Sequence, residues 1–182
     1  MPESAKTVSS LRKFRKLHRL FGLILATFLF ISAVTGLLLA WKKNVDWIQP
    51  PTSKGETKSL NNWKSLPELE LLATERIKKD FPNLKSHELD RIDIRPNKGM
   101  AKMLFTEKNM EVQIDGVSGE ILSVAKRNSD WIEALHDGSI ISDGFKLGSM
   151  NFLGLGLILL LSSGVWLWLG PRKIRLRRRR RT

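Results

Sequence analysis

Two long stretches of the chain contain no charged residue and are mostly apolar. They cover residues 20–41 and 147–170, which are 22 and 24 residues long. At about 1.5 Å per residue, an α-helix of either length spans roughly 33 to 36 Å, and the hydrocarbon core of a bilayer is about 30 Å thick. We therefore predict that both stretches are transmembrane helices.

The region between the two spans changes its pattern along the chain. Residues 42–65 are rich in Pro, Gly, Ser, Thr and Asn, a composition that breaks regular structure and predicts a linker. Residues 66–127 begin with apolar positions at helical spacing and continue with alternating apolar and polar positions, which predicts one helix and an antiparallel sheet of three or four strands. Residues 128–146 predict a short helix and a loop beside the membrane. The expected fold class is a membrane α protein in which two transmembrane helices flank a small α+β domain.

Positive charge is concentrated at the two ends of the chain. The formal net charge is +13, yet residues 43–146 hold 16 basic and 17 acidic residues, so the excess lies in the tails 1–19 and 171–182. Lys and Arg that flank a transmembrane helix are retained in the cytoplasm. We therefore expect two cytoplasmic basic tails that contact the lipid bilayer, an extracytoplasmic central domain, and no nucleic-acid partner.

Three segments of the chain resemble a known family. Gln113–Leu122 has the acidic-turn-Gly-Glu-x-Leu pattern of the last hairpin of a PepSY domain, Leu17–Leu23 opens the first span, and Leu135–Gly138 precedes the glycine-rich second span. Together they resemble the PepSY-associated transmembrane family, over about residues 11–171. The resemblance implies a protein of the bacterial inner (cytoplasmic) membrane whose PepSY-like domain is periplasmic or extracellular. Larger members of that family include reductases of iron-siderophore complexes, which bind b-type haem through histidines.

The resemblance gives a role to two of the three histidines, His18 at the start of the first span and His136 before the second. It implies that both are axial ligands of haem iron. The residue pattern leaves other roles open, because the small residues beside His18 would also suit close packing of another helix, and the imidazole of His136 could bind a loop carbonyl or face water. The small residues expected at helix contacts are Gly22, Ser32, Gly36, Gly154 and Gly156.

The predicted positions of the two histidines limit how they could bind iron. They stand at opposite faces of an apolar slab about 30 Å thick, so one chain cannot bind one iron with both imidazoles. A homodimer or a larger membrane complex would supply the second ligand at each face, inside a four-helix bundle. We identify no catalytic residue, and we expect Asp90, Asp93 and Asp115 to be solvated strand and turn residues.

The sequence leads to one functional hypothesis and one alternative. The hypothesis is a b-type haem-binding electron-transfer subunit linked to the reduction of ferric iron or of an iron-siderophore complex, either a reductase itself or a subunit of one. The alternative is a non-catalytic module, whose extracytoplasmic domain binds a partner or regulates a peptidase and whose helices serve only as anchors. Because neither span contains a charged residue, the pattern argues against ion transport.

Overall fold

The described part of the chain forms two compact units. The computed structural model describes residues 2–179, with side chains described for residues 9–170, so Met1 and residues 180–182 of the predicted basic tails lie outside the described residues. Met1–Gly36 together with Ala134–Thr182 form one unit, which we call the helical unit. Leu37–Glu133 form the other, which we call the sheet unit.

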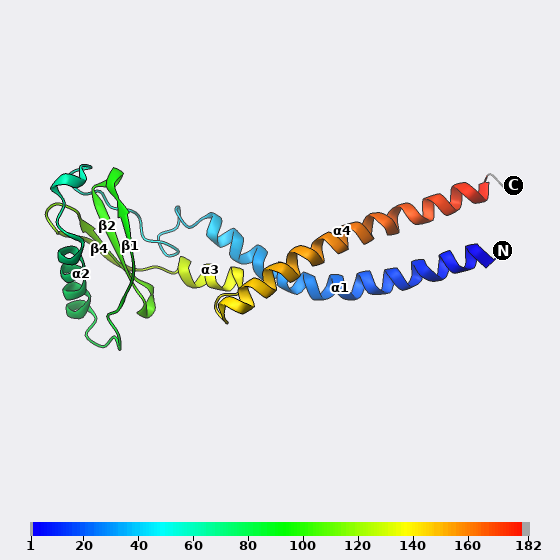
Figure 1. Ribbon diagram of the computed structural model, residues 1–182, viewed down its shortest axis with the longest axis horizontal. Coiled ribbons are helices and arrows are strands. Elements are labelled where there is room, and N and C mark those ends of the chain that lie inside the picture. Colours follow the sequence, from blue (N-terminus) through cyan, green and yellow to red (C-terminus); the bar gives the residue numbers. More distant parts are fainter. Residues whose placement is uncertain (1, 180–182) are drawn as a thin grey trace. The chain divides into compact units, whose positions relative to one another are not determined.

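The helical unit is built on two long helices, α1 (Pro2–Ala40) and α4 (Asp143–Arg179). Within them, Ser9–Ala40 and Asp143–Gly170 are long and apolar enough to cross a membrane. Both helices continue beyond the apolar runs, because Lys and Arg are good helix formers and the basic flanks do not interrupt the backbone hydrogen bonds. The N-terminal end of α1 and the C-terminal end of α4 lie at the same end of this unit (Figure 1).

The two long helices pack antiparallel with a seven-residue repeat. Each contact places a larger side chain of α1 opposite a small residue of α4, and the facing pairs are Leu11 with Gly170, His18 with Ser163, and Leu25 with Gly156. A seven-residue repeat is the spacing of a left-handed coiled coil. Leu25 is only 1% exposed, so the small residues of α4 let the two backbones approach closely.

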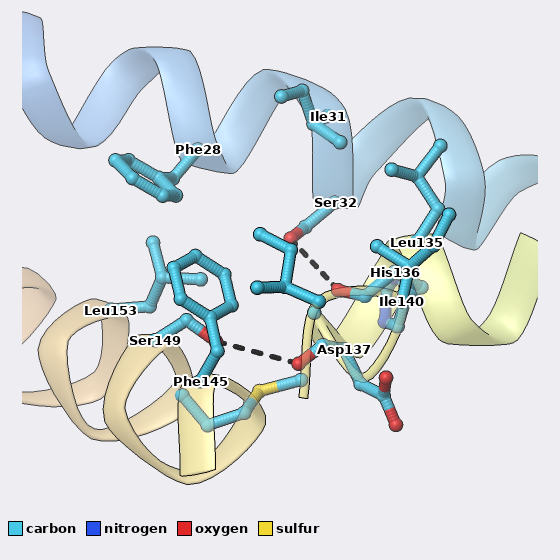
Figure 2. Close-up of a pocket in the computed structure, with 13 residues that line it drawn as sticks. Phe28, Ile31, Ser32, Leu135, His136, Asp137, Ile140, Phe145, Ser149 and Leu153 are labelled. Atoms are coloured by element: carbon cyan, nitrogen blue, oxygen red, sulfur yellow. Dashed lines mark hydrogen bonds between the residues drawn. The ribbon is translucent and has the colours of Figure 1, made fainter. Parts of the chain in front are cut away.

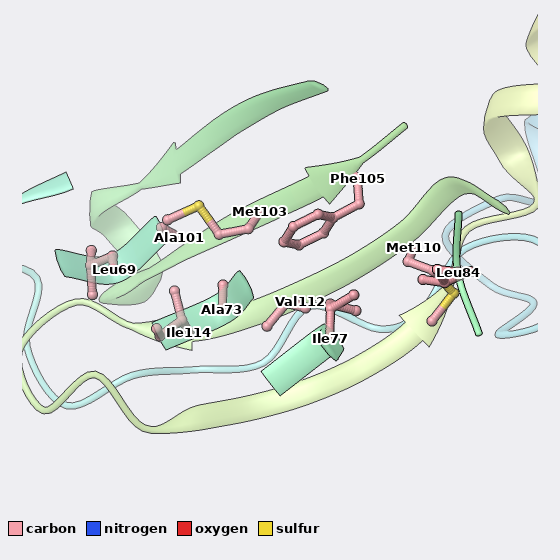
Figure 3. Packing of buried hydrophobic residues seen from close by; sticks show 10 residues of the cluster. All are labelled: Leu69, Ala73, Ile77, Leu84, Ala101, Met103, Phe105, Met110, Val112 and Ile114. Carbon is pink, nitrogen blue, oxygen red and sulfur yellow. The ribbon is translucent and has the colours of Figure 1, made fainter. Parts of the chain in front are cut away.

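The sheet unit contains one helix and four antiparallel strands. Helix α2 (Leu66–Asp80) packs on one face of a sheet in the order β1-β2-β3-β4. The strands are β1 (Leu89–Arg95), β2 (Met100–Phe105), β3 (Met110–Asp115) and β4 (Ile121–Lys126), joined in part by the short 3-10 turns η2 (Pro96–Lys98) and η3 (Glu107–Asn109). The core between α2 and the sheet consists of Leu69, Ala73, Ile77, Leu84, Ala101, Met103, Phe105, Met110, Val112 and Ile114 (Figure 3). This arrangement confirms the predicted helix and antiparallel sheet.

The second face of the sheet is covered by the residues that the sequence predicts as a linker. Within residues 42–65, all of which the structure describes, the 3-10 turn η1 (Leu60–Asn62) is the single helical or strand element. The backbone N–H of Ser53 donates to Gln113 Oε1 (2.7 Å), and that of Glu56 donates to Asp115 Oδ2 (2.6 Å). The expectation that Asp115 is solvated is therefore wrong. It is 1% exposed, because the covering segment and the turn after β3 supply the N–H donors that its carboxylate needs.

A buried ion cluster lies on this second face. Glu111 of β3 is fully buried, and its carboxylate accepts hydrogen bonds from Lys102 of β2 (2.8 Å) and from Arg127 (3.2 Å). Arg127 also pairs with Asp130 (2.7 Å) in the first turn of α3 (Ser129–Asp137). The ion pairs therefore connect the centre of the sheet to the start of the helix that carries His136.

Candidate functional site

His18 lies in the interface between α1 and α4. Its Nδ1 is 2.7 Å from Oγ of Ser163, and the same Oγ donates a hydrogen bond to the carbonyl oxygen of Leu160 (3.1 Å). A Cβ placed on Gly164 would lie 3.6 Å from Cε1 of His18. The imidazole is half-buried and rests on the dipeptide Ser163-Gly164 of the facing helix.

His136 lies near the end of α3 and packs on α1. Its Nδ1 is 2.9 Å from Oγ1 of Thr35, which is buried and donates to the carbonyl oxygen of Ile31 (2.7 Å). A Cβ placed on Gly36 would lie 3.3 Å from Cε1 of His136. Ser32 donates a longer hydrogen bond to the carbonyl oxygen of His136 (3.4 Å), and Figure 2 shows this contact from α1 to the backbone of α3.

The two histidines therefore rest on the same kind of support. In each case a hydroxyl side chain binds Nδ1, and the glycine that follows it in the chain lies beside Cε1. We call the dipeptides Ser163-Gly164 and Thr35-Gly36 the two imidazole cradles. The structure records no hydrogen bond to Nε2 of either histidine within residues 9–170, and these residues do not enclose either Nε2.

The two cradles lie far apart along the membrane helices. Thr35 follows His18 by 17 residues on α1, which corresponds to about 26 Å at about 1.5 Å per residue. This separation is close to the thickness of the hydrocarbon core, about 30 Å. One cradle therefore lies toward each end of the membrane-spanning part of the helical unit.

A mostly apolar pocket adjoins the His136 cradle. It has a volume of about 190 Å³ and lies between α1, the end of α3 with the following turn, and the start of α4 (Figure 2). Its apolar side chains include Phe28, Ile31, Leu135, Ile140, Ile141, Phe145, Met150 and Leu153. Pockets for ligands of drug or cofactor size are about 300 to 1,000 Å³. The pocket of one chain could therefore take only part of a porphyrin, and other walls would have to complete the enclosure.

Asp137, beside this pocket, is held as a carboxylate. Burial raises its pKa, but hydrogen bonds from Lys146 (2.5 Å) and from the backbone N–H of Ser139 (2.9 Å) outweigh this effect, and together they lower the pKa of Asp137 to about 2. An acid with this pKa is ionised at neutral pH, so Asp137 is not a proton donor there. The ion pair also satisfies the charge of Lys146 next to the apolar run.

The other candidate groups do not gather around the cradles. His87 lies before β1 in the sheet unit, and its Nε2 is buried without a hydrogen-bond partner. Among the residues that the structure describes, no three His, Asp or Glu side chains are grouped as ligands of a bare metal ion.

The small residues predicted at helix contacts occupy different surroundings. Ser32 and Gly36, which the sequence predicts at helix contacts, belong to the surroundings of His136. A Cβ placed on Gly22 would lie 3.7 Å from Leu160, and one placed on Gly156 would lie 2.6 Å from Leu25, so both glycines face the other long helix. A Cβ placed on Gly154 has no neighbour within 4 Å in the described chain, so the expected helix contact of Gly154 stays a prediction.

The sequence reasoning did not single out Thr35, Ser163 or Gly164 as site residues. A signal was present, because each uncharged run contains a single hydroxyl residue followed by glycine, at Thr35-Gly36 and at Ser163-Gly164. The signal becomes meaningful only when the register of α1 against α4 is known.

Comparison with known proteins gives one result. A family model described as PepSY-associated TM region matches residues 15–182. No curated protein matches the chain.

Proposed function

The chain belongs to the PepSY-associated TM region family, and from this membership and the two cradles we propose that it is an electron-transfer membrane protein that binds b-type haem through His18 and His136. The observation that carries the proposal is the repetition of the cradle at both ends of the helical unit. A histidine that ligates a metal usually donates its other ring N–H to a neighbouring group, which fixes the ring. Both imidazoles are bound at Nδ1, and both leave Nε2 without a partner in the described chain.

A second copy of the chain completes the proposed sites. Each cradle supports one imidazole, and His18 lies about 26 Å along α1 from Thr35, which supports His136, so one chain cannot supply both axial ligands of one iron. A homodimer would bring two His18 imidazoles to one end and two His136 imidazoles to the other, in a four-helix bundle. The small volume of the pocket beside His136 supports the same proposal, because it leaves part of the enclosure to another chain.

The proposed direction of electron transfer follows from the charge distribution. The basic residues before His18 support a cytoplasmic location for that end of the helical unit, and the proposed topology has the sheet unit on the outer side of a bacterial inner membrane. His18 and His136 would hold haem, and haem would supply one-electron chemistry between a reduced donor and ferric iron or a ferric siderophore complex. The role of this chain is to hold the two imidazoles, to exclude water with the apolar side chains around them, and to span the membrane.

The test is the haem content per chain of purified variants. We expect the wild-type protein to contain haem, and we expect His18→Ala and His136→Ala each to lose the haem at its own end. The matched control is His87→Ala, which removes the remaining histidine from the other unit and should keep the full haem content. Equal haem content in the wild type and in both cradle variants would contradict the proposal. A folded wild-type protein without haem would favour the anchored binding module instead.

A further inference from the structure

We propose that Thr35 and Ser163 are positioning residues that fix the tautomer of His136 and His18, with the hydrogen on Nδ1 and the lone pair on Nε2. The inference rests on the proposed function in one respect only, which is that Nε2 binds haem iron. The tautomer itself is a property of the chain alone, so it can be tested whether or not haem is present.

The hydrogen bonds of Thr35 determine which group donates to which. A threonine hydroxyl has one hydrogen and two lone pairs, whereas a carbonyl oxygen can only accept. Thr35 Oγ1 lies 2.7 Å from the carbonyl oxygen of Ile31 and 3.2 Å from that of Ser32, so its hydrogen is directed to its own helix. With its hydrogen on a carbonyl of its own helix, the oxygen offers only lone pairs to His136, and in the proposed tautomer Nδ1 donates to it at 2.9 Å.

Ser163 repeats the arrangement at the other end. Its hydroxyl donates to the carbonyl oxygen of Leu160 at 3.1 Å and is 2.7 Å from Nδ1 of His18. The opposite tautomer would let each hydroxyl donate to Nδ1, but it would leave an N–H on Nε2 with no acceptor in the described chain. An N–H without an acceptor is costly in an apolar environment, so the Nδ1–H tautomer satisfies one more hydrogen bond at each site.

This tautomer is the one that binding of iron through Nε2 requires. A neutral imidazole binds iron through the nitrogen that carries the lone pair, and the hydrogen bond of the other nitrogen decides which one that is. Gly36 keeps space for the ring of His136, because a Cβ there would lie 3.3 Å from Cε1, whereas a Cβ at Gly164 would make an ordinary contact of 3.6 Å with Cε1 of His18. The cradle therefore sets both the proton position and the place of the ring before any cofactor binds.

The first experiment measures the tautomers without haem. The full chain is labelled with 15N at its three histidines, reconstituted without haem in lipid, and examined by NMR at about pH 8, above the usual imidazole pKa of about 6.5. We expect His18 and His136 to carry hydrogen on Nδ1. Thr35→Val, which keeps the shape and removes the hydroxyl, should move His136 toward the Nε2–H form and leave His18 unchanged. Thr35→Ser should restore the wild-type spectrum.

The same variants at the other cradle complete the test. Ser163→Ala should change the tautomer of His18 alone, and Ser163→Thr should restore it. The inference is overturned if either histidine of the wild type carries its hydrogen on Nε2, or if Thr35→Val and Ser163→Ala leave the tautomers unchanged.

A second readout separates this inference from the proposed function. In haem-loaded protein, Thr35→Val should shift the reduction midpoint potential of one haem, and Thr35→Ser should return it to the wild-type value. If the protein binds no haem but the tautomers respond as described, the proposed function fails and the positioning role stands. If haem binds and the tautomers do not respond, the positioning role fails and the proposed function stands.

Discussion

Two glycines of α4, only two residues apart, should respond in opposite ways to the same substitution. An ideal Cβ on Gly156 would lie 2.6 and 2.7 Å from the two methyl carbons of Leu25, which is 1% exposed. Carbon atoms in good contact are about 3.5 to 4.0 Å apart, so Gly156→Ala requires a shift of about 1 Å. An ideal Cβ on Gly154 meets no atom within 4 Å in the described chain. Both substitutions gain the same helix propensity, up to about 1 kcal/mol, so this gain cancels when the two variants are compared.

The expected difference between the two variants is the cost of overpacking, about 1 to 3 kcal/mol, with Gly156→Ala the less stable. The assay is reversible unfolding in mixed detergent micelles, monitored by circular dichroism. Leu25→Ala is also combined with the wild type and with each of the two glycine variants. Because Leu25→Ala removes the clashing methyl groups, Gly156→Ala should cost no stability in that background. Equal stability of Gly154→Ala and Gly156→Ala would refute the register of α1 against α4. A loss of stability in Gly154→Ala alone would show that Gly154 contacts a neighbour outside the described chain.

Three further predictions concern the sheet unit, the membrane boundary and the His136 cradle. Glu111→Ala leaves the buried Lys102 without its ion-pair partner and takes one of two carboxylate partners from Arg127, so it should lower the free energy of unfolding in urea by roughly 3 to 5 kcal/mol. Glu75→Ala, on the exposed side of α2, should change it by less than about 0.5 kcal/mol. The pKa of Asp137 is lowered to about 2 in the folded protein. The stability that its carboxylate contributes is therefore fully present above the unfolded pKa of about 3.9 and is lost as the pH falls toward 2. Asp137→Asn should remove this pH dependence from thermal melts. Gly36→Leu should displace the imidazole and lower the haem content at that end, whereas Gly148→Leu should not, because a Cβ there meets no described atom within 4 Å. Equal haem content in the two variants would count against the cradle.

The membrane helices and the sheet could be predicted because their signals are local. An uncharged run of 22 or 24 residues leaves few alternatives to a span, and the alternation within residues 87–125 predicts strands without knowledge of their partners. The second face of the sheet was not predictable in this way. Pro50, Pro51 and Gly55 correctly indicate irregular structure. Irregular backbone can still pack on a sheet, however, and here its N–H groups donate hydrogen bonds to the side chains of Gln113 and Asp115.

The candidate site could be predicted only in part, for a similar reason. His18 and His136 stand out by residue type and by the resemblance to the family, but the hydroxyl that each one meets lies 145 or 101 residues away along the chain. The periodicity of α1 cannot say that Ser32 and Gly36 lie beside a histidine of α3. Such pairings are set by the register of one helix against another, which a single sequence does not display.

The central claim is that the two cradles hold haem, and the most direct measurement is a reduced-minus-oxidised absorption spectrum of the detergent-purified full chain, expressed with a haem precursor. The account predicts a sharp pair of b-type bands, which decrease in His18→Ala and in His136→Ala. A flat spectrum from folded protein extracted from the membrane would contradict the account.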